Sequence, residues 1–145
     1  MNIYFACSIT GGRQDAEIYR IMVETLQADG HDLPSAVFAV PSPGGGESHM
    51  EPEVVYRRDV AWIEACDVLI AEVSTPSHGV GYEIGYALHL GKPVLCLHRE
   101  EKTVSKMLTG NPDTLLQMMG YADVENGVAT MRACLAKILT ESAEN

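Results

Sequence analysis

The 145-residue chain lacks a long hydrophobic run, has only half as many basic as acidic residues, and carries few aromatic side chains. No apolar stretch reaches the roughly 20 residues that a membrane-spanning helix needs, and the N-terminus has no basic segment leading into an apolar one. A cytoplasmic location is therefore expected. The net charge of −10 repels nucleic acid and anionic membranes, so neither is an expected partner. A small phosphate stays possible, because backbone N–H groups at a helix N-terminus bind one locally.

Several cofactor motifs are also missing. The histidines form no HxxxH or HExxH pair, and the cysteines form no CxxC pair, so no metal site is expected. The GxGxxG pattern is absent from the first glycine-bearing turn and GxxxxGKS/T is absent throughout, which disfavours dinucleotides and P-loop nucleotides. No organic cofactor is indicated. The cysteines lie in apolar segments and are expected to be buried and reduced: Cys7, Cys66, Cys96 and Cys134.

Short apolar segments alternate with amphipathic ones along the whole chain. Strands are expected at residues 2–7, 31–40, 67–73, 92–98 and 116–121, with helices between and after them. This alternation predicts one domain over residues 1–145, an α/β three-layer sandwich with a five-stranded parallel sheet of flavodoxin or Rossmann-like type. Residues 41–53 are rich in Pro, Gly and Ser and are expected to form a long loop, with Pro41–Met50 as a candidate lid.

Two strands lead into turns that contain glycine, CSITGGR and TPSHGVGYE. Ligands of parallel sheets bind at the carboxyl ends of the strands, where both turns lie. Their hydroxyl groups and free N–H groups suit a monophosphate. The candidate substrate-binding residues of the two turns are Ser8, Ile9, Thr10, Gly11, Gly12, Arg13, Ser77, Gly79 and Gly81.

Glu83 stands among glycines in what is expected to be the first turn of a helix. There the helix dipole would keep its carboxylate ionised at neutral pH, and Gly79 and Gly81 would let the chain turn sharply. Glu83 could equally do no more than bond N–H groups of its own helix. Asp59 is most simply a member of a surface ion pair, and Tyr4 a core aromatic of the first strand.

Three segments together resemble the nucleoside 2-deoxyribosyltransferase superfamily, in particular its 2'-deoxynucleoside 5'-monophosphate N-hydrolases. They are YFACSITGGRQD, RRDVAWIEACDVLIAEVSTPSHGVGYEIG and KPVLCLHRE, and with them the resemblance covers nearly the whole chain. It implies that Glu83 attacks the anomeric carbon to form a covalent glycosyl-enzyme, which water then releases. It further implies that Asp59 helps to protonate the departing base and that Tyr4 hydrogen-bonds the nucleophile.

The same resemblance implies a phosphate pocket made by Ser8, Ser77 and a serine from the partner subunit, which matches Ser105. The expected assembly is therefore a homodimer with shared active sites. The related hydrolases have an arginine where this chain has Thr10, and the loss of that contact removes about 1.5–3 kcal/mol. Arg13 matches an arginine that the family retains.

The predicted function is hydrolysis of the N-glycosidic bond of 2'-deoxynucleoside 5'-monophosphates, with a small nucleotide as the partner. Three alternatives stay open: an N-glycosidase for CMP or a modified CMP, a nucleoside 2-deoxyribosyltransferase, and a non-catalytic nucleotide sensor on the same fold. Base preference does not follow from the sequence.

Overall fold

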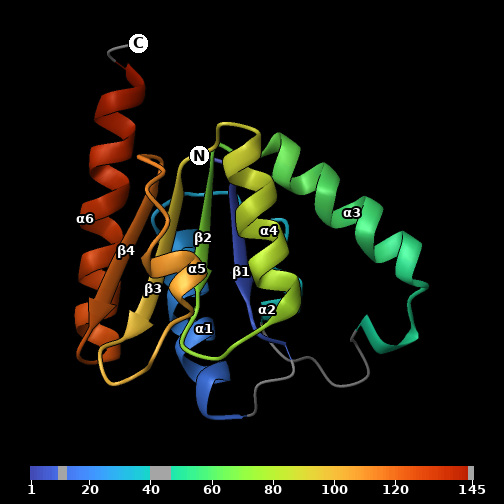
Figure 1. Cartoon of the computed structure of the whole chain (residues 1–145), viewed down its shortest axis with the longest axis horizontal. Coiled ribbons are helices and arrows are strands. Elements are labelled where there is room, and N and C mark those ends of the chain that lie inside the picture. The colour runs from blue at the N-terminus through green and yellow to red at the C-terminus, as the bar shows by residue number, and fades with distance from the viewer. Residues whose placement is uncertain (10–12, 40–46, 144–145) are drawn as a thin grey trace.

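A single parallel sheet forms the middle layer of the molecule (Figure 1). The computed structural model describes residues 1–9, 13–39 and 47–143. The strands follow one another in the order β1-β2-β3-β4, and all neighbours are parallel. They are β1 (Ile3–Cys7), β2 (Val68–Glu72), β3 (Val94–Arg99) and β4 (Leu116–Tyr121).

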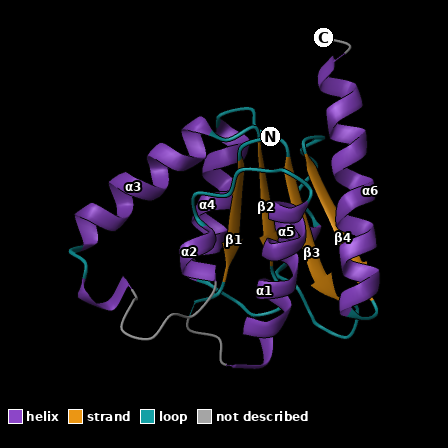
Figure 2. Ribbon diagram, turned by 180° about the vertical axis from the view of Figure 1, so that it is seen from behind, coloured by secondary structure: helices purple, strands orange, loops and turns teal. Residues whose placement is uncertain are grey.

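Helices cover both faces of this sheet (Figures 1 and 2). α1, α2 and α6 pack on one face, whereas α3 and α4 lie on the other, so the α/β layering expected from the sequence is present. The helical elements are α1 (Arg13–Ala28), α2 (Ala36–Ala39), η1 (Glu47–His49), α3 (Pro52–Ala65), α4 (His78–His89), α5 (Lys106–Thr109) and α6 (Val124–Ala143). Among the described residues, none of these helices combines the length and hydropathy needed to cross a bilayer.

Alternating strand residues divide the interior into two cores. Ile3 and Phe5 of β1 point into the core beneath α1 and α6, while Tyr4 and Ala6 point toward α3 and α4. Every residue of β1 and β2 is buried, as expected of parallel strands that are covered on both sides. Tyr4 therefore leaves the sheet on the face that carries Asp59 and Glu83.

The predicted fifth strand at residues 31–40 is wrong. Its start makes only an isolated parallel bridge between Asn2 and Asp32, and the rest turns into α2. Pro34 cannot donate a ladder hydrogen bond. Next to it, the Ser35 hydroxyl accepts from the Phe5 N–H (2.9 Å) and donates to the Phe5 carbonyl (3.0 Å). The Ser35 side chain and the Asp32 carbonyl, which accepts from the Ile3 N–H at 2.8 Å, thus satisfy part of the β1 edge that a strand would have paired, and the described residues form a sheet of four strands.

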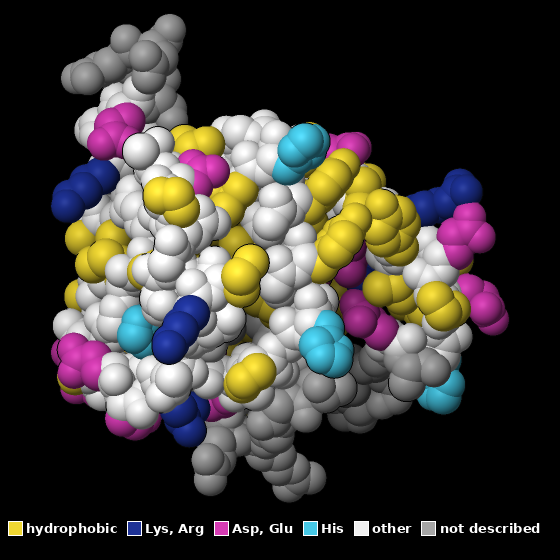
Figure 3. Space-filling model, viewed as in Figure 1, with side chains coloured by type: hydrophobic (Ala, Val, Ile, Leu, Met, Phe, Trp, Pro, Cys, Tyr) yellow, Lys and Arg dark blue, Asp and Glu magenta, His cyan; other side chains and the backbone are white. Residues whose placement is uncertain are grey.

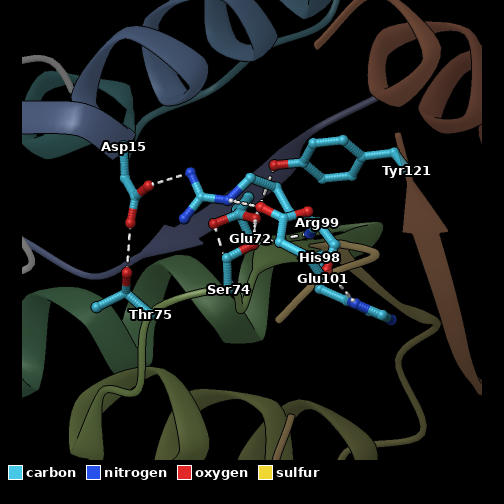
Figure 4. A network of polar contacts seen from close by, with 8 residues as sticks. All are labelled: Asp15, Glu72, Ser74, Thr75, His98, Arg99, Glu101 and Tyr121. Carbon is cyan, nitrogen blue, oxygen red and sulfur yellow. Dashed lines mark hydrogen bonds and ion pairs between the residues drawn. The ribbon is translucent and has the colours of Figure 1, made fainter. Parts of the chain in front are cut away.

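A buried carboxyl group lies where β2 ends (Figure 4). Glu72 is 1% exposed, and its Oε1 accepts a hydrogen bond of 2.9 Å from the Tyr121 hydroxyl and another from the Ser74 hydroxyl. The Ser74 N–H lies 3.4 Å from Oε2. Burial raises the pKa of Glu72, which these donors oppose.

A second buried acid ties α1 to the same edge of the sheet. Asp15 accepts from the Thr75 hydroxyl, and its other oxygen lies 2.5 Å from the Arg99 guanidinium (Figure 4). Thr75 precedes α4, so this contact holds the β2–α4 connection against α1. The two clusters are together called the sheet-edge network: Asp15, Glu72, Ser74, Thr75, Arg99 and Tyr121.

Candidate active site

A cleft of about 280 Å³ runs along β1 and past its carboxyl end, between α2, α3 and α4. Its polar lining comprises Tyr4, Ser35, Glu47, Arg58, Asp59, Ser77 and Glu83. A second cavity, of about 410 Å³, reaches the same acids from between α3 and α4. Hydrophobic side chains gather on the outer surface over these two helices (Figure 3), among them the exposed Tyr56 and Tyr82. Among the described residues, no group of three His, Cys, Asp or Glu could hold a metal ion.

Glu83 and Tyr4 are in direct contact. The Tyr4 hydroxyl, brought from β1, donates a hydrogen bond of 2.9 Å to Oε1 of Glu83 on α4. Tyr4 is 3% exposed, and burial raises the pKa of its hydroxyl, so the group is a neutral donor. The hydrogen bonds among the described residues leave Oε2 of Glu83 without a donor. One carboxylate oxygen is thus held in place, and the other is available at the cleft.

The position and charge of Glu83 differ from the expectation. α4 begins at His78, because Ser77 caps it by accepting from the Val80 N–H at 3.4 Å, and the first turn contains no acidic residue. Glu83 therefore lies beyond the reach of the strongest dipole effect. Burial raises its pKa from 4.5 to about 7; the Tyr4 hydrogen bond opposes this rise, and the charge of Asp59 adds to it. At neutral pH the carboxyl group is poised between its two forms rather than fully ionised.

The glycines around Glu83 do not form the sharp turn that was expected. Gly79 and Gly81 are both helical, and among the described residues the positive-φ glycines are Gly30 and Gly91, which follow α1 and α4. Gly79 lines the cleft. Gly81 instead lines a groove on another side of α4. A glycine inside a helix lowers stability by about 1 kcal/mol relative to alanine. What Gly79 and Gly81 provide in return is a stretch of helix backbone that no side chain covers.

Asp59 faces the cleft instead of forming the surface ion pair that was the simpler reading. Its side chain is 17% exposed, and its Oδ1 accepts from Nε of Arg58 at 2.8 Å. Burial raises the pKa of Asp59, and the Arg58 hydrogen bond opposes the rise. The structure thus brings Tyr4, Asp59 and Glu83 to one cavity.

The sequence reasoning overlooked Arg58, which lines the cleft beside Glu47 and Phe38. The sequence held one signal that Arg58 differs from the neighbouring Arg57. Arg57 has an acid four residues before it, Glu53, with which it pairs at 2.6 Å on the exposed surface. Arg58 has no acid four residues before or after it, since Val54 and Trp62 occupy those positions; it pairs instead with the adjacent Asp59 and with Glu47 from another element.

The expected phosphate-binding residues fall into separate groups. Ser77, Gly79 and the exposed Ile9 line the cleft. Ser8 is 4% exposed and is not among the described residues of the lining. Thr10, Gly11, Gly12 and most of the Pro41–Met50 loop lie outside the described residues, and Arg13 begins α1 with its side chain outside them.

Ser105 lies apart from the cleft of its own chain. It caps α5, accepting from the Met107 N–H at 3.2 Å, and lines an apolar groove of about 470 Å³ together with Gly81. Met107 in this groove is 82% exposed. Within one chain, therefore, Ser105 and Glu83 belong to different cavities.

Known proteins similar in sequence share one kind of name. A Methanosarcina mazei protein provisionally named 2'-deoxynucleoside 5'-phosphate N-hydrolase 1 is 45% identical over 124 residues, which cover 86% of this chain and 77% of that protein. The 5-hydroxymethyl-dUMP N-hydrolase of Mus musculus is 41% identical over 128 residues, covering 86% of this chain and 74% of the relative.

Solved structures give the same fold at lower identity. A Clostridium botulinum CMP N-glycosidase superimposes with a TM-score of 0.68 at 19% identity, covering 90% of this chain and 97% of the other. A 2-deoxyribosyltransferase from Bacillus psychrosaccharolyticus gives 0.65 at 20% identity, covering 87% and 89%. At this identity the likeness supports the fold alone. Residues 3–135 match the nucleoside 2-deoxyribosyltransferase family, and the chain belongs to that family.

Proposed function

We propose that the protein hydrolyses the N-glycosidic bond of 2'-deoxynucleoside 5'-monophosphates, releasing the free base and 2-deoxyribose 5-phosphate. The observation that carries this proposal is the Tyr4–Glu83 pair, which offers a carboxylate oxygen to the same cleft as Asp59. Relatives that are 41–45% identical and bear N-hydrolase names support it.

In the first step, Oε2 of ionised Glu83 attacks C1' of the sugar. The C1'–N bond breaks, its electron pair goes to the base nitrogen, and the base takes a proton from Asp59. The Tyr4 hydroxyl keeps Oε1 in place, so the attacking oxygen is aimed without further reorganisation. A raised pKa at Asp59 favours the protonated form that the departing base needs.

In the second step, water attacks C1' of the glycosyl-glutamate ester. Asp59, now ionised, accepts a proton from this water, and the C1'–Oε2 bond breaks to regenerate Glu83 as a carboxylate. Two displacements at C1' retain the configuration of the sugar. A 2-deoxy sugar suits this chemistry, because it lacks the electron-withdrawing 2-hydroxyl that destabilises an oxocarbenium-like transition state.

The 5'-phosphate is placed at the N-terminus of α4. Glu47, Asp59 and Glu83 line the cleft with Arg58 as the one cation among its described lining residues, so this acidic part is unfavourable for a phosphate dianion. Ser77 lies at the cleft where α4 begins, and its hydroxyl and the nearby N–H groups are suited to an anion. Arg13, at the start of α1, is the candidate cation for the same group.

A base-release assay tests the reaction class. The panel holds deoxynucleoside monophosphates including 5-hydroxymethyl-dUMP, the matching ribonucleotides including CMP, and free deoxynucleosides with and without an acceptor base. Fastest release from deoxynucleoside monophosphates without an acceptor is the expected result. Release only when an acceptor base is present would make the protein a transferase, and binding of nucleotides with no release from any of them would make it a sensor.

The active protein is further proposed to be a homodimer in which Ser105 reaches the phosphate of the neighbouring subunit. The exposed Met107 and the apolar groove around Ser105 support a protein contact there. Ser105 and Glu83 line different cavities of one chain, but both cavities include Ser77, so the test must distinguish a contribution to the partner's cleft from one to the same subunit's phosphate.

Mixed dimers test this sharing. Glu83→Gln and Ser105→Ala homodimers should each be impaired, the second through a raised KM for monophosphates but not for nucleosides. A mixed dimer contains one intact site, made by Glu83 of one chain and Ser105 of the other, so mixing should restore a wild-type KM. No restoration in a verified mixed dimer would place Ser105 in its own subunit's site or in none.

A further inference from the structure

Two neighbouring arginines of α3 have opposite surroundings. Arg57 has a side chain that is 76% exposed, and it pairs with Glu53 one helical turn before it. Arg58 is 15% exposed and turns into the cleft. Arg57 and Arg58 are the same residue type on the same helix. Any difference between their effects on the site therefore comes from the contacts that each side chain makes.

Arg58 is held by three elements. Its Nε donates to Asp59 Oδ1 at 2.8 Å, and its Nη2 lies 2.5 Å from Oε1 of Glu47 on η1. Its Cζ stands 3.9 Å from the ring centroid of Phe38 on α2 and 4.9 Å from that of Trp62. Aromatic faces and two carboxylates together fix both the position and the plane of the guanidinium.

We propose that Arg58 is a positioning residue of this cleft, which holds the Asp59 carboxylate in place and acts as the shared counter-ion of Glu47, Asp59 and Glu83. The proposal rests on the proposed function only in giving Glu83 and Asp59 their chemical roles. Among the described residues that line the cleft, Arg58 is the only cationic one.

The electrostatic reason is the crowding of acids. Three carboxylates in one small cleft repel one another, and a nearby cation favours their ionised forms. For Glu83, burial and the charges of Asp59 and Glu47 raise the pKa, whereas the Arg58 charge and the Tyr4 hydrogen bond lower it. The titratable or charged groups around Glu83 are Tyr4 and Cys7 from β1, Glu47 from η1, and Arg58 and Asp59 from α3.

The test compares Arg58→Gln with the matched control Arg57→Gln. Without the Arg58 charge, Glu83 is expected to hold its proton to a higher pH, so the acidic limb of the kcat/KM profile should move to higher pH, by less than about one unit because the Arg58 charge is the smallest of the influences on the Glu83 pKa. Arg57→Gln should leave the limb in place. Arg58→Lys keeps the positive charge but lacks the planar guanidinium. Its acidic limb should therefore lie at the wild-type pH, while its kcat stays below that of the wild type. If kcat/KM fell by the same factor at every pH and the acidic limb did not move, Arg58 would be no more than a packing residue.

A substrate-free readout separates this proposal from the reaction itself. Carbon-13 titration of labelled glutamate carboxyls, with the Glu83 signal assigned by its absence in Glu83→Gln, should show the same upward shift in Arg58→Gln. If the wild-type protein cleaves no nucleotide, the proposed function fails while this titration still decides the role of Arg58. Should Arg58→Gln not fold, Arg58→Met keeps an apolar side chain against Phe38 and Trp62 and also removes the charge, so it should give the same upward shift; an unshifted or lowered Glu83 titration there would overturn the proposal.

Discussion

Glu72 and Glu83 each accept a hydrogen bond of 2.9 Å from a tyrosine hydroxyl, but the rest of their surroundings differ. Glu72 belongs to the sheet-edge network, is 1% exposed, and also accepts from Ser74. Glu83 faces the cleft and has one oxygen without a donor among the described residues. The first carboxyl group is enclosed by its own fold, whereas the second is left open to a ligand.

The comparison shows that a raised pKa does not by itself identify a catalytic acid. Burial raises the pKa of both glutamates. The distinguishing features are geometric: a free acceptor oxygen, a cavity to receive a reactant, and a second carboxyl group, Asp59, in the lining of the same cavity. The predictions below change one member of each region in the same way and ask whether activity or stability responds.

The largest expected effect is on turnover, from Glu83→Gln compared with Glu72→Gln. Removing the nucleophile should reduce base release by about 10⁴-fold or more, while calorimetric nucleotide binding persists. Glu72→Gln should keep most of its turnover and lower the free energy of unfolding by about 1–2 kcal/mol, since the amide disturbs the hydrogen bonds from Ser74 and Tyr121. Equal loss of turnover in both variants would end the distinction between the two glutamates.

The next effect is on stability, from Asp15→Asn. Arg99 would lose its buried charged partner, the 5% exposed Asp15, and keep only the 64% exposed Glu101 at 3.3 Å, so urea unfolding should show a loss of up to about 3 kcal/mol. The control is Asp29→Asn, which breaks the exposed pair with Arg132 and should leave the unfolding midpoint nearly unchanged. Where Asp15→Asn is folded, kcat should match the wild type. A large fall in kcat in the folded variant would make the sheet-edge network part of the catalytic apparatus.

Tyr4→Phe and Tyr121→Phe form the closest matched pair. Each change removes one hydroxyl that donates to a glutamate at 2.9 Å. Tyr4→Phe should reduce turnover at pH 7 about tenfold, because the attacking carboxylate loses its anchor and its pKa rises. Tyr121→Phe should instead lower the free energy of unfolding by about 1 kcal/mol with turnover intact. Reversed outcomes for the two variants would contradict the assignment of the two regions.

The fold was largely accessible from the sequence because most of its signals are local. The apolar segment at 116–121 became β4 with the same bounds, and Gly30 and Gly91 end helices in left-handed conformations as C-terminal glycines do. The failure at residues 31–40 has a local cause in Pro34, which cannot donate a ladder hydrogen bond, and a tertiary one. The Ser35 hydroxyl satisfies the backbone of Phe5, and nothing in the local pattern reveals that contact.

The site, like the fold, has features that the sequence indicated and features that tertiary contacts determine. Family resemblance led to Tyr4, Asp59 and Glu83, and the structure brings all of them to one cleft. The protonation of Glu83 was misjudged because the sequence suggests a helix dipole, while burial by distant elements decides the pKa. Arg58 was overlooked for a related reason, since two of its partners, Phe38 on α2 and Glu47 on η1, come from other elements whose approach to α3 the local sequence does not indicate.

The remaining expected effect is a pH-dependent difference in stability between Glu83→Gln and the wild type. The pKa of Glu83 is raised by folding from 4.5 to about 7, so the unfolded chain gives up this proton first. The folded state is therefore favoured by this group below about pH 4.5, and the contribution disappears as pH rises through 7. At pH 4 both side chains are neutral and similar in shape, and the two proteins should unfold at the same temperature. At pH 8 the wild type must keep a charged carboxylate partly buried, so Glu83→Gln should have the higher Tm; Glu72 is present in both proteins and cancels. A Tm difference that is the same at both pH values would mean that Glu83 titrates as freely in the folded protein as in the unfolded chain, and the cleft would then impose no cost on its charge.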